Sequence, residues 1–216
     1  MRNTKIPSKI LSVKIIPDAH PSLLRALGIE GRTQSLGVLT TDSDDVSYAA
    51  LDEATKKANV FVAYAKSLYA GADNANTKLA GEFIGILAGD NPEEVRSGLQ
   101  AAVAYVESTG FYSANDDGSI RYFAECISST GAFLSEMAGV ARGTPMAYLI
   151  APPIEAVVAL DAAMKVADVE MRVFYGPPTE TNFAGALLTG EQYAVEAACA
   201  EFAARIKEIA DNPTGY

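Results

Sequence analysis

The chain has 216 residues, 49% of them hydrophobic and 20% charged, and its 17 basic and 27 acidic residues give a net charge of −10. Such a composition is typical of a chain that buries a core. The acidity excludes non-specific binding to nucleic acids and anionic membranes, because polyanions repel an acidic surface. The sequence shows neither the continuous apolar segment of a signal peptide nor the roughly 18 consecutive apolar residues of a membrane span. We therefore expect a cytoplasmic protein that binds neither nucleic acid nor membrane.

The first half of the chain alternates short β-rich runs with helical segments. Compact apolar and β-branched runs predict strands, and apolar residues at helical spacing predict helices. The expected strands are Ile10–Ile16, Ser35–Thr40, Val60–Ser67 and Phe83–Ala88. The expected helices are a short one at Pro21–Leu27, then Tyr48–Ala58 and Glu93–Glu107.

The second half follows the same order after a polar, turn-rich segment at Thr109–Ser119. The expected strands are Ile120–Ile127, Met146–Ile150, Glu170–Tyr175 and Ala184–Leu188. The expected helices are Ile154–Ala167 and Gln192–Ala210.

A repeat in the sequence connects the two halves. The segment Leu51–Val60 (LDEATKKANV) returns as Leu160–Val169 (LDAAMKVADV), 160 − 51 = 109 residues later. This distance is too long for a solenoid unit and indicates a duplicated domain. We place the two domains at residues 1–110 and 111–216. The order β-β-α-β-β-α in each predicts an α+β fold, a small antiparallel sheet with helices packed against one face.

Residues typical of catalysis or metal binding are few. The single histidine, His20, lies between a predicted strand and a short helix, where a surface role is the simplest interpretation. Cys126 and Cys199 lie in apolar surroundings without the spacing of a metal or redox motif, so we expect buried, reduced thiols. No nucleophile elbow, phosphate-binding loop or dinucleotide motif is present. We therefore predict no catalytic residue, no metal, no cofactor and no enzyme activity.

An acidic cluster is the strongest chemical feature. Asp42, Asp44 and Asp45 precede the helix predicted at Tyr48, either as a cap and solvated turn or as a cation-binding site. Glu82 supports the second interpretation, because a carboxylate at the start of an apolar strand is hard to explain by packing.

The second copy differs at the matching acidic positions. Aligning Gly185 with Gly81 makes Ala186 the counterpart of Glu82, and Pro153 and Ile154 stand where the first copy has Asp44 and Asp45. A site formed once per chain would show this divergence.

Two other features have open alternatives. Lys56 recurs as Lys165 on the polar face of the second helix, either as solvated charge or as a contact with a partner. The loop Pro177–Phe183 is either a structural turn or a source of neutral hydrogen-bonding groups at Thr179, Thr181 and Asn182.

These residues together resemble the bacterial microcompartment shell family, and more narrowly the tandem-domain shell proteins of ethanolamine-utilisation compartments. The resemblance covers most of residues 35–190, and a divergent N-terminus and a central stretch (SSTGAFLSEMAG and ARGT) depart from it. The matching stretches are SLGVLTTDSDDVSYAALDEATKKA, AKSLYAGADNANTKLAGEFIGILAG, PMAYLIAPPIEA and PPTETNFAGALLTG.

The resemblance implies two circularly permuted shell domains per chain and a flat pseudo-hexagonal homotrimer that joins other shell proteins in a hexagonal layer. It places Lys56 and Lys165 at the edges of this tile. It also implies a gated central pore that ethanolamine, a small cationic amino alcohol, closes. The ethanolamine-binding residues would be Asp44, Asp45, Glu82, Phe111, Thr181 and Asn182. The pore or gate loops would include Tyr69, Asn74, Tyr112 and Phe183.

Two other functions are compatible with the same acids. A stand-alone sensor would bind the small molecule in the same acidic site without forming a layer. An enzyme would use Asp44, Asp45 and Glu82 as acid and base.

Overall fold

The computed structural model describes residues 3–29, 31, 35–68, 79 and 81–215. They form two compact units, and each is described by itself. The N-terminal unit comprises Pro7–Thr109 and Gly131–Leu134, and the C-terminal unit comprises Met1–Ile6, Gly110–Thr130 and Ser135–Tyr216. Short segments are therefore exchanged: the first six residues belong with the second half of the chain, and Gly131–Leu134 belongs with the first half.

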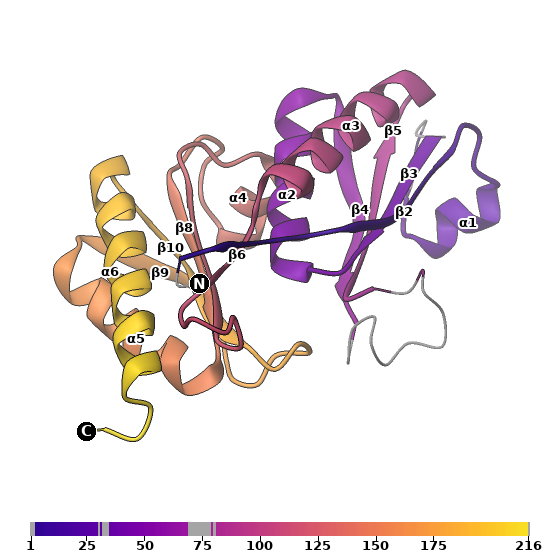
Figure 1. The fold of residues 1–216 in the computed structure, drawn as a ribbon. Coiled ribbons are helices and arrows are strands. Elements are labelled where there is room, and N and C mark those ends of the chain that lie inside the picture. The colour runs from indigo at the N-terminus through magenta and orange to yellow at the C-terminus, as the bar shows by residue number, and fades with distance from the viewer. Residues whose placement is uncertain (1–2, 30, 32–34, 69–78, 80, 216) are drawn as a thin grey trace. The chain divides into compact units, whose positions relative to one another are not determined.

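The N-terminal unit contains a four-stranded antiparallel sheet in the order β2-β3-β5-β4, and Figure 1 shows α2 and α3 running over it. The predicted elements are confirmed, with shifted boundaries. The strands are β2 Ile10–Ile16, β3 Ser35–Thr41, β4 Val60–Ser67 and β5 Phe83–Gly89. The helices are α1 Pro21–Ala26, α2 Asp44–Lys57 and α3 Pro92–Ser108.

The two long helices of this unit pack on one face of the sheet. Gly37 of β3 lies under α3, where an added Cβ would come within 2.7 Å of Val95 Cγ1, so the helix approaches the strand closely. The neighbouring Leu36 points to the opposite face and forms a small core with Ala88 and Leu24 of α1. The short helix α1 therefore covers the other face.

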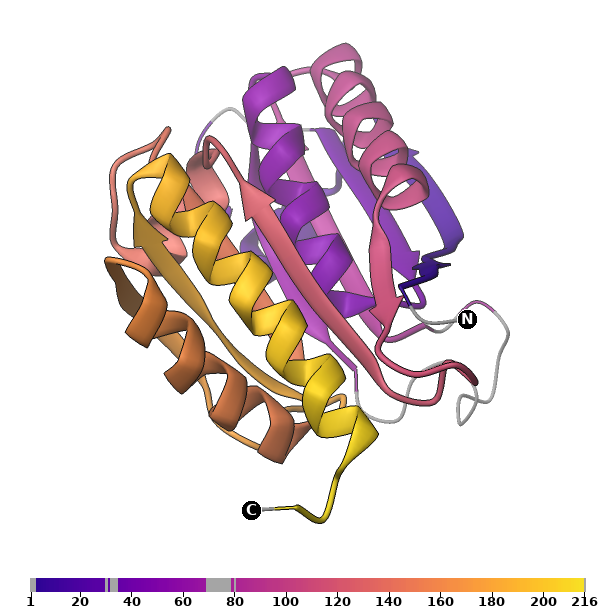
Figure 2. The same cartoon turned by 60° about the vertical axis from the view of Figure 1, so that its left-hand side comes forward.

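The C-terminal unit contains a six-stranded sheet in the order β1-β6-β7-β8-β10-β9. Figure 2 shows α5 and α6 side by side along it, and an alanine-rich core lies beneath them, around Leu149, Leu160 and Phe202. The strands are β1 Lys5–Pro7, β6 Gly110–Ser113, β7 Arg121–Ile127, β8 Met146–Ala151, β9 Val169–Tyr175 and β10 Ala184–Gly190. The helices are α5 Pro153–Val166 and α6 Gln192–Asp211, and the short helix α4, Ala132–Ala138, begins in the N-terminal unit and ends in this one.

Three elements were not predicted. β6 lies inside Thr109–Ser119, interpreted above as a polar turn, and pairs with β7 and β1. α4 lies in a segment expected to be a loop, and β1 is too short to show a pattern. As a result, β7 is an interior strand, whereas its counterpart β2 is the edge of its sheet.

Candidate functional site

The acidic cluster lies at the start of α2, which begins at Asp44 rather than at Tyr48 as predicted. A hydrogen-bond network replaces a simple side-chain cap: the Thr41 and Ser47 hydroxyls lie 2.6 Å apart, and Ser47 Oγ donates to the Ser43 carbonyl at 2.7 Å. Both acids in the first turn interact favourably with the helix dipole. The interpretation as a solvated turn was therefore wrong for Asp44 and Asp45.

Asp44 and Asp45 are buried, each with 6% of its surface exposed. Burial raises the pKa of Asp44, and hydrogen bonds from the Ser67 side chain and the Asp45 backbone partly offset this shift. The Tyr48 hydroxyl lies 3.1 Å from Ser67 Oγ, and burial also raises the pKa of Tyr48. Two adjacent buried carboxyl groups beside two hydroxyl groups are suited to binding a small cation that also carries a hydroxyl group.

Asp42 does not belong to this group. Its Oδ1 accepts the Lys9 backbone N–H at 2.6 Å, and its own N–H donates to the Lys9 carbonyl at 3.2 Å. This reciprocal pair extends the contact of β2 with β3, so Asp42 has a structural role.

Glu82 lies at the same end of the sheet as the acids. Its backbone N–H donates to the Thr41 carbonyl at 2.9 Å, and its carbonyl accepts the Leu68 N–H at 2.7 Å. The preceding Gly81 is required, since an added Cβ would lie 1.7 Å from the Thr41 oxygen. Glu82 therefore stands between the ends of β3 and β4.

The strand registers correct the alignment that made Ala186 the counterpart of Glu82. Thr41 pairs with Phe83 on β5, and its repeat partner Ile150 (41 + 109) pairs with Gly185 on β10. Gly185 thus matches Phe83, and Ala184 matches Glu82. The assignment of Ala186 as the counterpart of Glu82 was therefore wrong, but the second copy still has an alanine, Ala184, where the first copy has an acid.

The other predicted ligand residues belong to the C-terminal unit, whereas the acids belong to the N-terminal unit. Phe111 packs against Phe183 with ring centroids 5.5 Å apart. Thr181 Oγ1 lies 3.4 Å from Thr179 Oγ1, and Asn182, with φ of 63°, donates its backbone N–H to the Thr179 carbonyl at 3.0 Å. The structure therefore brings Phe111 together with the 177–183 loop.

The residues predicted for the gate differ in their positions. Tyr69 and Asn74 lie outside the described residues. Tyr112 stacks on Tyr122 with centroids 6.0 Å apart and lines a cavity of about 380 Å³ that also borders Cys199 and Lys207. Since successive residues of a strand point to opposite faces, Tyr112 does not join Phe111 and Phe183.

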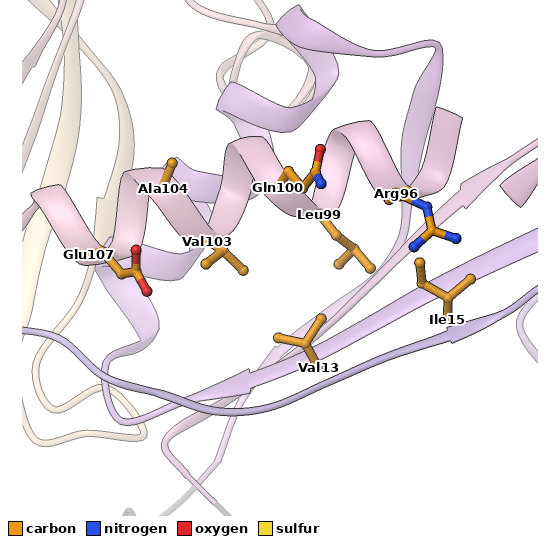
Figure 3. Close-up of a pocket in the computed structure, with 8 residues that line it drawn as sticks. All are labelled: Val13, Ile15, Arg96, Leu99, Gln100, Val103, Ala104 and Glu107. Carbon is orange, nitrogen blue, oxygen red and sulfur yellow. The ribbon is translucent and has the colours of Figure 1, made fainter. Parts of the chain in front are cut away.

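A second hollow lies in the N-terminal unit between the edge strand β2 and α3 (Figure 3). It has a volume of about 370 Å³, and Val13, Leu99 and Val103 give it an apolar lining. None of the predicted site residues lines it.

The two repeated lysines have different surroundings. Lys56 is 26% exposed and forms ion pairs with Glu53 at 2.5 Å and Asp52 at 3.9 Å, whereas Lys165 is 71% exposed and pairs with Asp161 at 2.5 Å. Asp52, which lies four residues before Lys56 on α2, is only 1% exposed. This burial was not anticipated.

The remaining polar candidates have structural roles. His20 Nδ1 accepts the Ser22 N–H at 3.2 Å and caps α1. Cys199 is buried as predicted, but Cys126 is only half-buried, and burial raises the pKa of both thiols. In the part of the chain that the structure describes, no group of three metal-ligating side chains is found. None of the helices described there is long and apolar enough to cross a membrane.

The BMC domain model matches residues 35–115. The bacterial microcompartment shell protein EutL of Clostridium perfringens is 58% identical over 217 residues, covering 100% of both chains. The crystal structure of the ethanolamine utilization protein EutL from Leptotrichia buccalis is 57% identical, covers 100% of both chains and superposes with a TM-score of 0.98. A trimeric shell protein, PduB, shares the fold at 18% identity and a TM-score of 0.75, over 94% of this chain and 89% of its own. The relatives are named as shell proteins, which agrees with the prediction that the chain is not an enzyme.

Proposed function

Since this chain belongs to the EutL family of bacterial microcompartment shell proteins, we propose that three copies form a flat trimeric tile with a gated central pore. The tile joins other shell proteins in a hexagonal layer, and ethanolamine binding favours the closed pore. Each of the two domains, residues 1–110 and 111–216, contributes one of six similar positions around the ring.

The internal duplication supports the tile. Two similar domains per chain, repeated three times, imitate a ring of six and leave the copies free to differ. α2 and α5 carry the same Asp–Lys pair, Asp52 with Lys56 and Asp161 with Lys165. In the proposed layer the two lysines lie at the tile edges, where they contact neighbouring tiles.

The main support for ethanolamine as the ligand is the burial of Asp44 and Asp45 beside Ser67. A buried carboxylate is stabilised by a cation, and the ethanolamine ammonium group supplies one, with Glu82 as a further acid. The hydroxyl group of ethanolamine bonds to Thr181 or Asn182. Phe111 offers an aromatic face, with a cation–π contribution of about 0.5–2 kcal/mol.

The gate consists of loops that border the candidate ligand residues. The loop Pro177–Phe183, with Phe183 packed on Phe111, borders the pore. A ligand shifts such a gate only by its difference in affinity between the two states. Ethanolamine therefore favours the closed pore if the acids and the loop can both contact it only in the closed state.

Two measurements test the assembly and the ligand separately. Light scattering after size exclusion and electron microscopy should show trimers that form sheets. Calorimetry should show weaker ethanolamine binding to Glu82→Gln than to the unchanged chain, with the trimer intact. Asp90→Asn, an exposed acid just after β5 in the same unit, is the matched control and should bind normally. Unchanged affinity of Glu82→Gln would place the site elsewhere.

The second candidate function is a stand-alone sensor that binds the same ligand. The burial of the two acids favours it equally, because the site needs no layer. A chain that binds ethanolamine but stays monomeric at all concentrations would favour the sensor over the tile.

A further inference from the structure

A segment from the second half of the chain covers one face of α2. Asp52 Oδ2 accepts the Gly131 N–H at 2.6 Å, and its Oδ1 accepts the Leu134 N–H at 2.9 Å. Thr55 Oγ1 accepts the Ala132 N–H at 2.8 Å. The approach is close, because a Cβ at Gly131 would lie 2.4 Å from Thr55 Oγ1.

Apolar contacts accompany these hydrogen bonds. The Phe133 ring stacks on Tyr48 with centroids 6.2 Å apart, and the Leu134 side chain is fully buried. The face of α2 that carries Tyr48, Asp52 and Thr55 is therefore an occupied docking face, and Gly131–Leu134 is its occupant.

The matching face of α5 is exposed in the described chain. Adding 109 to the residue numbers converts Tyr48 to Val157, Asp52 to Asp161 and Thr55 to Met164. Val157 is 45% exposed, the Asp161 side chain 62% and Met164 37%, and Ile154 on the same helix is 74% exposed. We call Ile154, Val157, Asp161 and Met164 the α5 face.

The chain also contains a counterpart of the occupant. α1 lies between β2 and β3 as α4 lies between β7 and β8, and four residues separate strand from helix in both cases. The helices start at Pro21 and Ala132, 132 − 21 = 111 residues apart, so Leu23 matches the buried Leu134. Leu23 is 40% exposed. His20–Leu23 therefore corresponds to Gly131–Leu134.

We propose that the α5 face of one chain is covered by His20–Leu23 of a second copy of the chain. Leu23 packs on Val157 and Met164, and Asp161 accepts backbone N–H groups of the incoming segment. Each chain then offers one face and one segment, which is a head-to-tail interface of the kind that closes into rings. The inference rests on the proposed trimer and names the contact between its chains.

Cross-linking between two introduced cysteines tests this contact in the full-length chain. Ser22 and Val157 are the counterparts of the stacked pair Phe133 and Tyr48, so Ser22→Cys and Val157→Cys place two thiols across the proposed interface. Cys126→Ala and Cys199→Ala remove the native thiols. A short bismaleimide should join the chains into covalent dimers and trimers on a denaturing gel, whereas each single-cysteine variant should give none.

A second variant tests the same face without cross-linking. Val157→Glu places a charge in the apolar contact and should weaken chain association at least about tenfold, as expected for a central interface residue. Tyr193→Glu, on α6 and 71% exposed, introduces the same charge elsewhere and should leave the trimer unchanged.

The possible failures are distinguishable. Trimers that give no cross-link and tolerate Val157→Glu would overturn this inference and leave the proposed tile standing. A cross-link formed only within single chains would also overturn it, since the occupant would then be the chain's own α1. An unchanged chain that is monomeric at all concentrations would overturn both proposals.

Discussion

The Asp52 carboxylate accepts the Gly131 N–H at 2.6 Å across 79 residues of sequence, whereas its repeat counterpart Asp161 forms an ion pair with the exposed Lys165 at 2.5 Å. One repeated aspartate therefore organises backbone within the chain, and the other remains at the surface. Asp52 therefore helps to complete its own unit, whereas Asp161 lies where a neighbouring chain can contact it.

Asp52→Ala should destabilise the N-terminal unit strongly. The change leaves the buried N–H groups of Gly131 and Leu134 without their acceptor, which costs about 2–4 kcal/mol of unfolding free energy. Urea unfolding measures the loss, and Asp90→Ala, an exposed acid of the same unit, should change the value by less than about 0.5 kcal/mol. Equal effects of the two variants would show that the Asp52 hydrogen bonds contribute little.

Asp44→Asn should stabilise the ligand-free chain at neutral pH. Burial raises the folded-state pKa of Asp44, so the folded state binds a proton more tightly than the unfolded state. The stability that this tighter proton binding gives to the folded state is fully present below the pKa of Asp44 in the unfolded chain. It is lost as the pH rises through the pKa of Asp44 in the folded chain. Asparagine removes the buried charge and should add about 0.5–2 kcal/mol at pH 7.

Unfolding measured between pH 4 and pH 8 checks this sign. The unchanged chain should lose stability relative to Asp44→Asn as the pH rises, and Asp90→Asn should follow the unchanged chain. A variant less stable than the unchanged chain at pH 7 would contradict a raised Asp44 pKa.

Most of the fold could be predicted because most strands are compact apolar runs and the long helices have an apolar face. The start of α2 could not, since Thr41-Asp-Ser-Asp-Asp is also typical of a turn, and the Thr41–Ser47 contact that replaces a cap is tertiary. β6 is held by pairing with β7 and β1 rather than by its own sequence.

The site was predictable only in part. Asp44 and Asp45 became candidates because they form an acidic cluster whose positions differ between the copies, a signal that needs no structure. Tyr48 and Ser67 gave no such signal, because a tyrosine in a helix and a serine at a strand end are ordinary residues. The burial of Asp52 depends on Gly131, 79 residues away, so no local pattern reveals it.

Lys56→Glu combined with Lys165→Glu should leave trimers soluble but prevent sheets. Reversed charge at two proposed tile edges introduces repulsion wherever two tiles meet. Size exclusion checks the trimer and electron microscopy the sheets, with Lys57→Glu, an exposed neighbour of Lys56, as a control that still forms sheets. Extended sheets of the double variant would place the tile edge elsewhere.

The two native thiols should react slowly in the folded chain. Burial raises the pKa of Cys199 and of Cys126, which lowers the fraction of reactive thiolate. Labelling at pH 7.5 with a chromogenic disulfide should modify half-buried Cys126 before Cys199, and both should react much faster in urea. Rapid labelling of Cys199 in the native chain would contradict its burial.

Ethanolamine titration into the trimer, followed by calorimetry, tests the central claim that the unrepeated acids bind the ligand. The unchanged chain should bind ethanolamine at pH 7, and Asp44→Asn combined with Asp45→Asn, which keeps the shape and removes both charges, should lose at least about 2 kcal/mol of binding free energy, as expected when a buried charged partner is lost. Equal affinity of the two chains would contradict the account.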